Sequence, residues 1–208
     1  MKISIDEIKE RLSLPLPGEK AHIPFSPPGR ATSSKVLKKS HDYKSSAVAL
    51  TFFENVNQDV ELILMQRPHY NGVHSNQICF PGGRKELVDK NLSQTAIRES
   101  NEEIGLKAEN FNLLGKLTPV YVPVSSFKIQ PILYSYSEIP VFKMDRREVA
   151  DVFTFPFDLL FQNEIIKNTN IKLYNQTVLE NVPYFDIQGR IVWGATALIM
   201  NELRSMFI

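Results

Sequence analysis

The sequence has few of the features that would assign it to a specialised class of protein. Cys79 is its single cysteine, which excludes an internal disulfide. No apolar run approaches the ~20 residues that a membrane-spanning helix requires, and the N-terminal residues do not have the apolar core of a signal peptide. We therefore expect no membrane partner and a cytoplasmic location.

An excess of charge of either sign is also missing. The 208 residues include 24 Lys and Arg and 23 Asp and Glu, which gives a formal net charge of +1. This balance excludes a general polyanion-binding surface, so we expect no nucleic-acid partner and only local recognition of phosphate. The sequence contains no internal repeat, and its length suits one domain with a substantial core.

What the sequence does contain is a chemically dense stretch from Gln77 to Leu106. It begins with the apolar run Ile78 to Phe80, which predicts a buried strand and makes Cys79 a core residue rather than a nucleophile. The Pro-Gly-Gly that follows ends this strand and turns the backbone. A polar loop comes next, and after it the pattern predicts a helix.

The predicted helix has Ser93 as its expected N-cap and Gly105 as its expected C-cap. At about 100° of rotation per residue, three acidic side chains fall on one arc of this helix. They are Glu99, Glu102 and Glu103. The neighbouring side, expected to pack on a sheet, carries Ala96, Ile97, Ser100 and Ile104.

Three carboxylates on one arc repel each other, and like charges at these spacings destabilise an isolated helix. Something should compensate this repulsion, and clustered carboxylate oxygens are the ligands that Mg²⁺ and Mn²⁺ prefer. The arc therefore indicates a candidate metal site. A solvated acidic face of the helix is the alternative that the pattern leaves open.

The spacing of these residues resembles the Nudix box, whose general form is G-x5-E-x7-R-E-U-x-E-E-x-G-U, with U an apolar residue. The fixed places are filled by Gly83, Arg98, Glu99, Glu102, Glu103, Gly105 and Leu106. Asp89 stands where the first Glu is expected, one extra residue precedes Arg98, and Ser100 occupies the first U position. The first two departures resemble the coenzyme A diphosphatase branch of the family, which has G-x5-D-x8-R-E.

The residues before the box are similar to the leader of the same branch, L-L-T-x-R-S-x-x-L-x-x-H-x-G-Q-x-x-F-P-G-G. The matching positions are Ile63, Leu64, Arg67, His74, Gln77, Phe80, Pro81, Gly82 and Gly83. Met65, Pro68, Asn71 and Asn76 depart from it. Asn76 replaces a Gly, and Asn tolerates positive φ better than most residues. The resemblance covers roughly residues 30 to 203.

Strand runs and two substantial helices around one core predict an α/β layered fold. The resemblance implies the Nudix α/β/α sandwich with a mixed sheet. We expect residues 41–208 to form this domain, and residues 1–40 to form an N-terminal helix followed by a Pro-rich arm. The helix should span residues 2–13, with Ser4 and Glu7 at capping-box spacing. The arm, with Pro15, Pro17, Pro24, Pro27 and Pro28, should be stiff and extended.

Further elements are expected from runs of apolar residues and from turn residues. Residues 46–53 and 60–67 should form a hairpin, and residues 111–117 and 149–155 should be strands. A helix should run from Pro156 to Phe161, and a variable loop or weak hairpin should occupy residues 162–181. A hairpin around Gly189 and a helix beginning at Trp193–Gly194 should end the chain.

The resemblance implies metal-dependent hydrolysis of coenzyme A or its acyl esters to 3',5'-ADP and a 4'-phosphopantetheine. One alternative is another Nudix activity, on ADP-ribose, a dinucleotide or an oxidised nucleotide. The other is a module that senses a nucleotide without turnover, against which the intact R-E-x-x-E-E argues. The expected partner is a small nucleotide substrate, and a homodimer is left open.

The resemblance also implies roles for the residues of the box. Glu99 and Glu103 would be the main ligands of Mg²⁺ or Mn²⁺, with Glu102 as a third and the Gly82 carbonyl as an additional ligand. Arg98 would point away from the acidic arc and pair with a loop acid, either Glu86 or Asp89.

Residues outside the box complete the expected site. The general base is a box Glu or Glu148, for which a charge at a strand end is the alternative. Arg67, Arg30 and Arg84, in that order, are candidates for binding a substrate phosphate. A surface charge is the alternative for Arg67, and a surface wrap over a sheet edge is the alternative for the Arg30 segment. His69 and His74 have no ligand at metal-site spacing, so we interpret both as polar loop residues.

Overall fold

The computed structural model describes residues 2–27, 29–38 and 42–208. A mixed sheet forms its centre, with the strand order β3-β2-β1-β7-β5 along the main path. The strands of this sheet are β1 Lys44–Glu54, β2 Val60–Gln66, β3 Ile78–Cys79, β4 Gly82–Arg84, β5 Phe111–Lys116, β6 Val120–Val122, β7 Phe127–Tyr136 and β8 Asp151–Pro156. β4 pairs with β1, β6 with β7 and β8 with β2.

Helices and a smaller sheet surround this centre. The helices are α1 Ile5–Leu12, α2 Glu19–His22, α3 Ser33–Leu37, α4 Leu92–Ile104 and α5 Gly194–Ser205. The 3-10 turns are η1 Ile23–Phe25, η2 Ala108–Asn110, η3 Pro123–Ser125, η4 Phe157–Phe161 and η5 Asn163–Ile165. A three-stranded antiparallel sheet consists of β9 Ile166–Lys172, β10 Val178–Ile187 and β11 Arg190–Val192.

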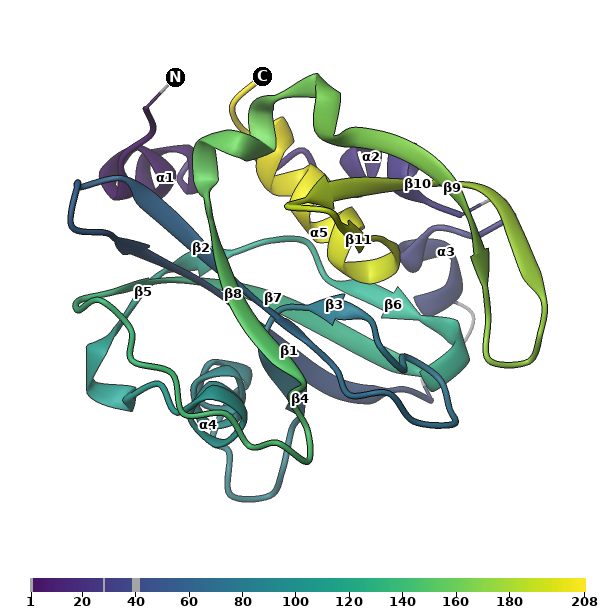
Figure 1. Cartoon of the computed structure of the whole chain (residues 1–208), viewed down its shortest axis with the longest axis horizontal. Helices are drawn as coiled ribbons and strands as arrows, with labels where there is room; N and C mark the ends of the chain where they lie inside the picture. Colours follow the sequence, from purple (N-terminus) through teal and green to yellow (C-terminus); the bar gives the residue numbers. More distant parts are fainter. Residues whose placement is uncertain (1, 28, 39–41) are drawn as a thin grey trace.

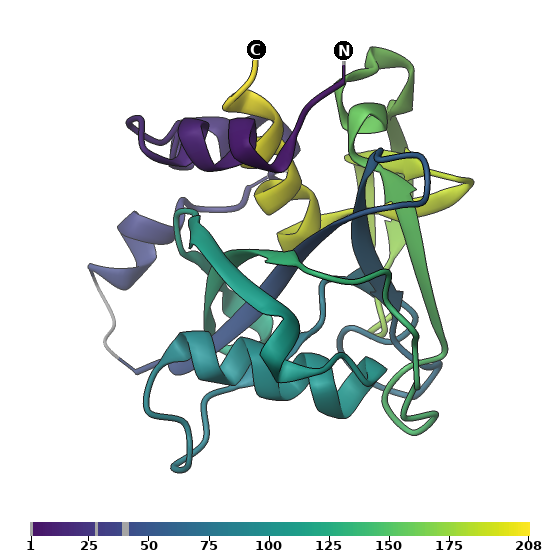
Figure 2. The same cartoon turned by 90° about the vertical axis from the view of Figure 1, so that its left-hand side faces the viewer.

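The two faces of the central sheet are covered differently. Helix α4 packs on one face, whereas α1, α2 and α5 lie on the other (Figures 1 and 2). Small side chains on β1 allow α4 to approach closely, since Ala47 and Ala49 pack with Ala96. Larger side chains such as Phe52 fill the opposite face, where they join the core that includes α5. The α/β/α arrangement that the resemblance implied is therefore confirmed.

Strand β1 changes partner along its length, and this positions the glycine turn. Its first half pairs with β4, where Val48 is opposite Gly82, and its second half pairs with β2, where Phe52 is opposite Leu62. β7 runs parallel to β1 on the other side. As a result, the Pro-Gly-Gly segment lies against the central strand and contacts α4, the helix that follows it in the chain.

The N-terminal segment confirms one prediction and corrects another. Helix α1 begins as expected, since the Ser4 hydroxyl accepts a hydrogen bond from the Glu7 N–H at 3.2 Å. The Pro-rich arm is not extended, because Pro24 lies in a 3-10 turn that buries Phe25. The Phe25 ring stacks on Phe185 at 4.2 Å between centroids, and this packing stabilises a compact turn. Pro28 and the expected domain boundary after residue 40 lie outside the described residues.

The remaining elements follow the sequence pattern with local differences. β1 and β2 form the expected hairpin, and β10 and β11 form another around Gly189, whose φ is 79°. The expected helix after Pro156 is the short 3-10 turn η4, and the expected loop or weak hairpin at 162–181 contains the β9–β10 pair. Among the described residues, no helix combines the length and apolar character needed to cross a membrane.

Candidate active site

Helix α4 carries the acidic arc and begins earlier than the sequence predicted. Its N-cap is Asn91 rather than Ser93, because the Asn91 side chain accepts a hydrogen bond from the Gln94 N–H at 3.0 Å. Ser93 lies inside the first turn, and its hydroxyl contacts the Tyr134 hydroxyl at 2.7 Å. The predicted C-cap is confirmed: Gly105 has φ 77° and its N–H donates to the Asn101 carbonyl.

The two glycines of β4 allow the strand to touch the acidic arc. A Cβ on Gly83 would lie 2.5 Å from the Glu99 carboxylate, and a Cβ on Gly82 would lie 2.3 Å from the Ala47 carbonyl oxygen. Gly82 also has φ 151°, which favours glycine. Its N–H donates to Glu103 Oε2 at 2.8 Å. A side chain at position 82 would clash with the backbone of β1, and one at position 83 would displace the Glu99 carboxylate.

Glu103 is a buried carboxyl group with an unusual pKa. Its side chain is 2% exposed. The pKa of Glu103 is raised to about 8, mainly by burial and also by the charges of Glu99 and Glu148, while the Gly82 N–H and the charge of Arg67 act in the opposite direction. Nearby hydrogen bonds and positive charges therefore do not fully offset the cost of ionising this buried carboxyl group.

Glu99 and Glu148 belong to the same electrostatic group. Burial raises the pKa of the half-buried Glu99, Arg98 opposes this, and the charges of Glu102 and Glu148 add to the rise. Glu148 comes from a different segment, the loop at 140–150. That loop folds against the end of α4, where the Asp145 N–H donates to the Glu103 carbonyl at 2.9 Å. The structure thus brings the exposed Glu148 within electrostatic reach of both box acids.

Arg98 binds the expected loop acid. Its Nε donates to Asp89 Oδ1 and its Nη2 to Asp89 Oδ2, both at 3.0 Å. This pairing lowers the pKa of Asp89 to about 2. Glu86 contributes only its backbone N–H, which donates to Asp89.

The expectation that Arg98 points away from the acidic arc is wrong. Its Nη2 lies 2.9 Å from Glu99 Oε1, and its Nη1 lies 2.8 Å from Glu102 Oε2. Glu102 is one helical turn from Arg98, so the two side chains share one face of α4. The guanidinium therefore joins the loop acid to two acids of the arc.

The side chains of the site are of a type that binds a divalent cation, although they are not arranged around one. In the described ranges, no three acidic, His or Cys side chains converge closely enough to hold a metal ion as they stand. Glu102 faces Arg98, and Glu103 accepts the Gly82 N–H. Nevertheless, the charge of Glu148 raises the pKa values of Glu99 and Glu103, the charge of Glu99 also raises the pKa of Glu103, and a cation would relieve this repulsion. The oxygen donors are of the type that hard cations bind.

Arg67 follows β2 and lies against this acidic group. Burial lowers its pKa, but Cys79, Tyr70 and Glu103 act in the opposite direction, so the pKa of Arg67 is raised overall. Its Nε is buried and has no hydrogen-bond partner among the described residues. The pKa of the Cys79 thiol is raised to about 12, mainly by burial, which suits a core residue and not a nucleophile.

The other two candidate arginines have different environments. Arg30 Nη2 donates to the Tyr121 carbonyl at 2.6 Å, and the Ser33 hydroxyl accepts from the Tyr121 N–H at 2.9 Å. Arg30 and Ser33 thus bind the carbonyl and the N–H of Tyr121 on the short strand β6. This agrees with the alternative that the segment wraps over a sheet edge. Arg84 is exposed, and its carbonyl accepts from Arg98 Nη2 at 3.1 Å.

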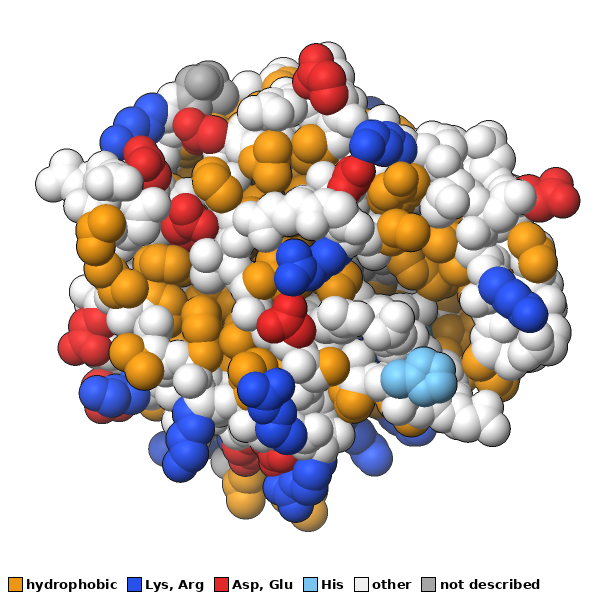
Figure 3. Space-filling view, in the orientation of Figure 1, with side chains coloured by type: hydrophobic (Ala, Val, Ile, Leu, Met, Phe, Trp, Pro, Cys, Tyr) orange, Lys and Arg blue, Asp and Glu red, His pale blue; other side chains and the backbone are white. Residues whose placement is uncertain are grey.

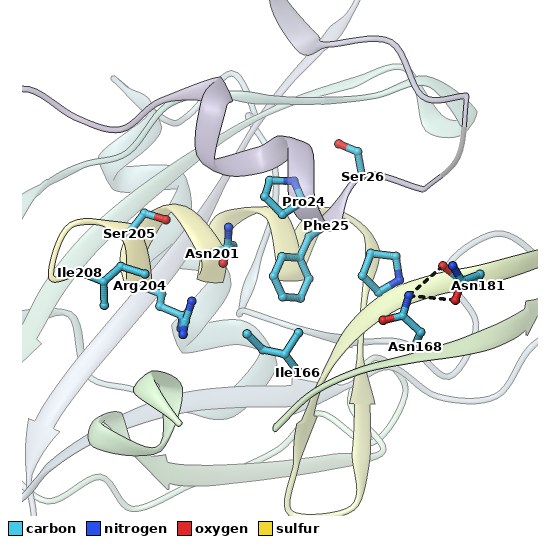
Figure 4. Close-up of a pocket in the computed structure, with 11 residues that line it drawn as sticks. Pro24, Phe25, Ser26, Ile166, Asn168, Asn181, Asn201, Arg204, Ser205 and Ile208 are labelled. Carbon is cyan, nitrogen blue, oxygen red and sulfur yellow. Dashed lines mark hydrogen bonds between the residues drawn. The ribbon is translucent and has the colours of Figure 1, made fainter. Parts of the chain in front are cut away.

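A separate surface hollow of about 520 Å³ lies between η1, the β9–β10 pair and α5 (Figure 4). Its polar side chains already have partners: Arg204 donates to Asn163 Oδ1 at 2.6 Å, Asn201 to the Ala21 carbonyl, and Asn168 to Asn181. The hollow shares no lining residue with the acidic group on α4. Its lining residues include no acidic side chain that would indicate catalysis.

The surface in Figure 3 carries both signs of charge. Lys and Arg side chains gather towards the lower part of this face, where Figure 1 places α4 and the loops around it. This local gathering occurs although the whole chain has a formal net charge of only +1.

Comparison with known proteins identifies the class. The NUDIX domain family model matches residues 43–176, which is more than half of the chain. The chain therefore belongs to the Nudix family and is a hydrolase that acts on diphosphate anhydrides. Nudix hydrolases generally use divalent metal ions and bind small nucleotide substrates.

Individual relatives agree with this assignment. The chain is 29% identical over 167 residues to an uncharacterized Nudix hydrolase, NudL, of Pectobacterium atrosepticum, covering 80% of this chain and 84% of that protein. It is also 29% identical over 142 residues to the NudL of Yersinia enterocolitica, covering 68% and 71%. The crystal structure of RenU, a Nudix hydrolase from M. smegmatis, matches with a TM-score of 0.55 and 14% identity over 78% of this chain and 84% of that one. The Nudix-type fold is thereby confirmed.

One contact of the loop that follows Arg67 was not expected from the sequence. His74, interpreted there as a polar loop residue, lies 3.2 Å from the Ser125 hydroxyl through its Nε2. The two residues are 51 positions apart, and no spacing rule connects them. The match of His74 to the family leader was the signal that could have drawn attention to it.

Proposed function

We propose that this Nudix hydrolase cleaves coenzyme A or its acyl esters to 3',5'-ADP and a 4'-phosphopantetheine. The box variant with Asp89 and the leader from Ile63 to Gly83 support this substrate. The observation that carries the proposal is the placement of Arg67, with an unpartnered buried Nε, against the acidic group that contains Glu103. Such a site combines donors for a cation with a donor for phosphate.

In this proposal Glu99 and Glu103 hold Mg²⁺ or Mn²⁺, with Glu102 and the Gly82 carbonyl as additional ligands. The cation supplies neutralisation of the diphosphate charge and a lower pKa for a bound water. The protein's own residues set the geometry: Arg98 fixes Glu99 and Glu102 relative to the Asp89 loop, and the glycines place β4 against the helix. Glu148, exposed and close to both box acids, is our candidate for the general base, with a box Glu as the alternative.

The substrate has a 3'-phosphate that other ADP derivatives do not carry. We propose that an arginine reads this phosphate, with Arg67 first, then Arg30 and Arg84. Support is strongest for Arg67, because Arg30 already donates to β6 and Arg84 is exposed. A charge-assisted contact of this kind is worth about 1.4 kcal/mol, or roughly tenfold in kcat/KM.

Steady-state kinetics on coenzyme A, dephospho-coenzyme A and ADP-ribose under identical Mg²⁺ test the proposal. We expect coenzyme A to exceed dephospho-coenzyme A in kcat/KM by roughly tenfold or more, and Arg67→Ala to remove most of that difference. A preference for ADP-ribose would refute the coenzyme A assignment and leave another Nudix activity. Turnover of none of these, nor of a dinucleotide or an oxidised nucleotide, would favour the sensing module.

Several sequence predictions remain predictions. These are the division of the chain after residue 40, the cytoplasmic location, the absence of nucleic-acid and membrane partners, and the open choice between monomer and homodimer. Each concerns a property outside the chemistry of the site.

A further inference from the structure

The loop between β2 and β3, residues 67–77, contains a strained segment. His74 has φ 68° and Asn76 has φ 59°. Residues other than glycine seldom adopt this left-handed conformation, and they keep it where surrounding contacts hold it in place. The contacts that hold this loop are therefore informative about what the loop does.

The His74 ring uses both of its nitrogens. Nδ1 lies 3.0 Å from Gln77 Oε1, and Nε2 lies 3.2 Å from Ser125 Oγ. An amide oxygen only accepts hydrogen bonds, so Nδ1 donates to Gln77, and Nε2 is left to accept from the Ser125 hydroxyl. Burial lowers the pKa of His74, and the charge of Arg67 acts in the same direction, which favours the neutral ring that this arrangement requires.

The bond to Gln77 lies within the loop, and the bond to Ser125 joins the loop to the central sheet. The base of the loop is closed by its own backbone, since the Arg67 N–H donates to the Gln77 carbonyl at 3.0 Å. Ser125 belongs to η3, and the next residue, Ser126, accepts the N–H of Lys44 at the start of β1 at 2.8 Å. Through His74, the loop is thus attached to a turn that β1 itself holds.

Arg67 stands at the base of this loop, between His74 and the acidic group. Its charge acts on the pKa values of both His74 and Glu103. Its Nε lacks a partner among the described residues, so contacts made by that atom do not fix the side chain. The Arg67 backbone stays bonded to Gln77, so release of the loop from Ser125 would change the position of the Arg67 side chain relative to Glu103.

We propose that His74 is a positioning residue: by attaching the 67–77 loop to Ser125, it holds Arg67 where a phosphate group of the substrate binds. This inference rests on the proposed function, in which Arg67 contacts that phosphate. A residue that acts in this way affects substrate binding more than the chemical step, because it leaves the acids of α4 in place.

Kinetics on coenzyme A at saturating Mg²⁺ test the inference with wild type, His74→Ala, Ser125→Ala and the double variant. We expect His74→Ala to raise KM about tenfold while kcat changes less than about threefold. Ser125→Ala should raise KM in the same direction. The double variant should be no worse than His74→Ala, because both changes remove the same bond. His74→Gln, which keeps a donor and an acceptor, should recover part of the lost affinity.

Two further variants separate a positioning role from general damage. In an Arg67→Ala background, His74→Ala should add nothing to KM, because the group that it positions is absent. His69→Ala is the matched control, since His69 is an exposed histidine of the same loop, and its KM should equal that of wild type. Thermal melting of each variant confirms that the chain is folded.

An unchanged KM in His74→Ala, or an effect that adds fully to that of Arg67→Ala, would overturn the inference. Failure of the proposed function looks different: wild type itself would not turn over coenzyme A. The same kinetics would then use whichever diphosphate substrate the wild type hydrolyses. Hydrogen exchange provides a readout without turnover, and the amides of residues 69–77 should exchange faster in His74→Ala than in wild type. Equal exchange would overturn the attachment itself.

Discussion

Arg98 and Arg67 both lie beside acids of α4, and their hydrogen bonds differ. All three guanidinium nitrogens of Arg98 have acceptors, which are Asp89, Glu99, Glu102 and the Arg84 carbonyl. Arg67 retains a buried Nε with no partner among the described residues. A fully bonded cation maintains the shape of a site, whereas a buried donor without an acceptor costs free energy unless a ligand supplies one. This difference supports the structural role that we propose for Arg98 and the phosphate-binding role that we propose for Arg67.

The largest expected effect comes from the acids that both arginines face. Glu103→Gln and Glu99→Gln should each lower turnover at least about a hundredfold at saturating Mg²⁺, because each removes part of the charge that stabilises the reacting site. The fold should persist, since Gln keeps the volume and, at position 103, an oxygen for the Gly82 N–H. Steady-state rates together with circular dichroism measure both outcomes. Near-normal turnover of Glu103→Gln with Mg²⁺ and Mn²⁺ would refute the metal-ligand assignment.

The local parts of this site were predictable from the sequence. Gly105 ends α4 because a left-handed C-cap needs glycine, and turn residues mark such positions in any sequence. The acidic arc follows from helical periodicity, and the Arg98–Asp89 pair is one of the two pairings that the family resemblance implied. Each of these features depends on residues near one another in the chain.

Features that depend on distant contacts were not predictable. The arm forms helical turns because Phe25 stacks on Phe185, and the Pro-rich composition alone favours an extended chain. His74 meets Ser125 because of how β2, β3 and η3 are arranged in the sheet. The extra contacts of Arg98 to Glu99 and Glu102 required side-chain positions that helical angles alone do not specify.

The second prediction compares how much each of the two arginines contributes to the stability of the fold. Arg98→Ala should destabilise the fold by about 2 kcal/mol, because the buried Asp89 loses its charge-assisted bonds, whereas Arg67→Ala should change stability much less. The lowered pKa of Asp89 means that its contribution is present above its unfolded value of about 4 and is lost as pH falls towards about 2. The melting-temperature difference between wild type and Arg98→Ala should therefore shrink over that range. An unchanged melting temperature with lost activity would instead make Arg98 a substrate-binding residue.

The smallest expected effect concerns the start of the helix that presents these acids. Asn91→Ala should cost about 1 kcal/mol, since it removes the side-chain acceptor of the Gln94 N–H at the N-terminus of α4. Ser93→Ala is the matched control, because Ser93 lies within the first turn and its hydroxyl contacts Tyr134 rather than a helix N–H. Chemical denaturation of both variants gives the two free energies of unfolding. The Asn91 variant should lose stability while its kcat remains close to that of wild type, because the acidic arc lies two turns further along the helix. A larger loss in Ser93→Ala than in Asn91→Ala would return the N-cap to Ser93, as the sequence pattern first indicated.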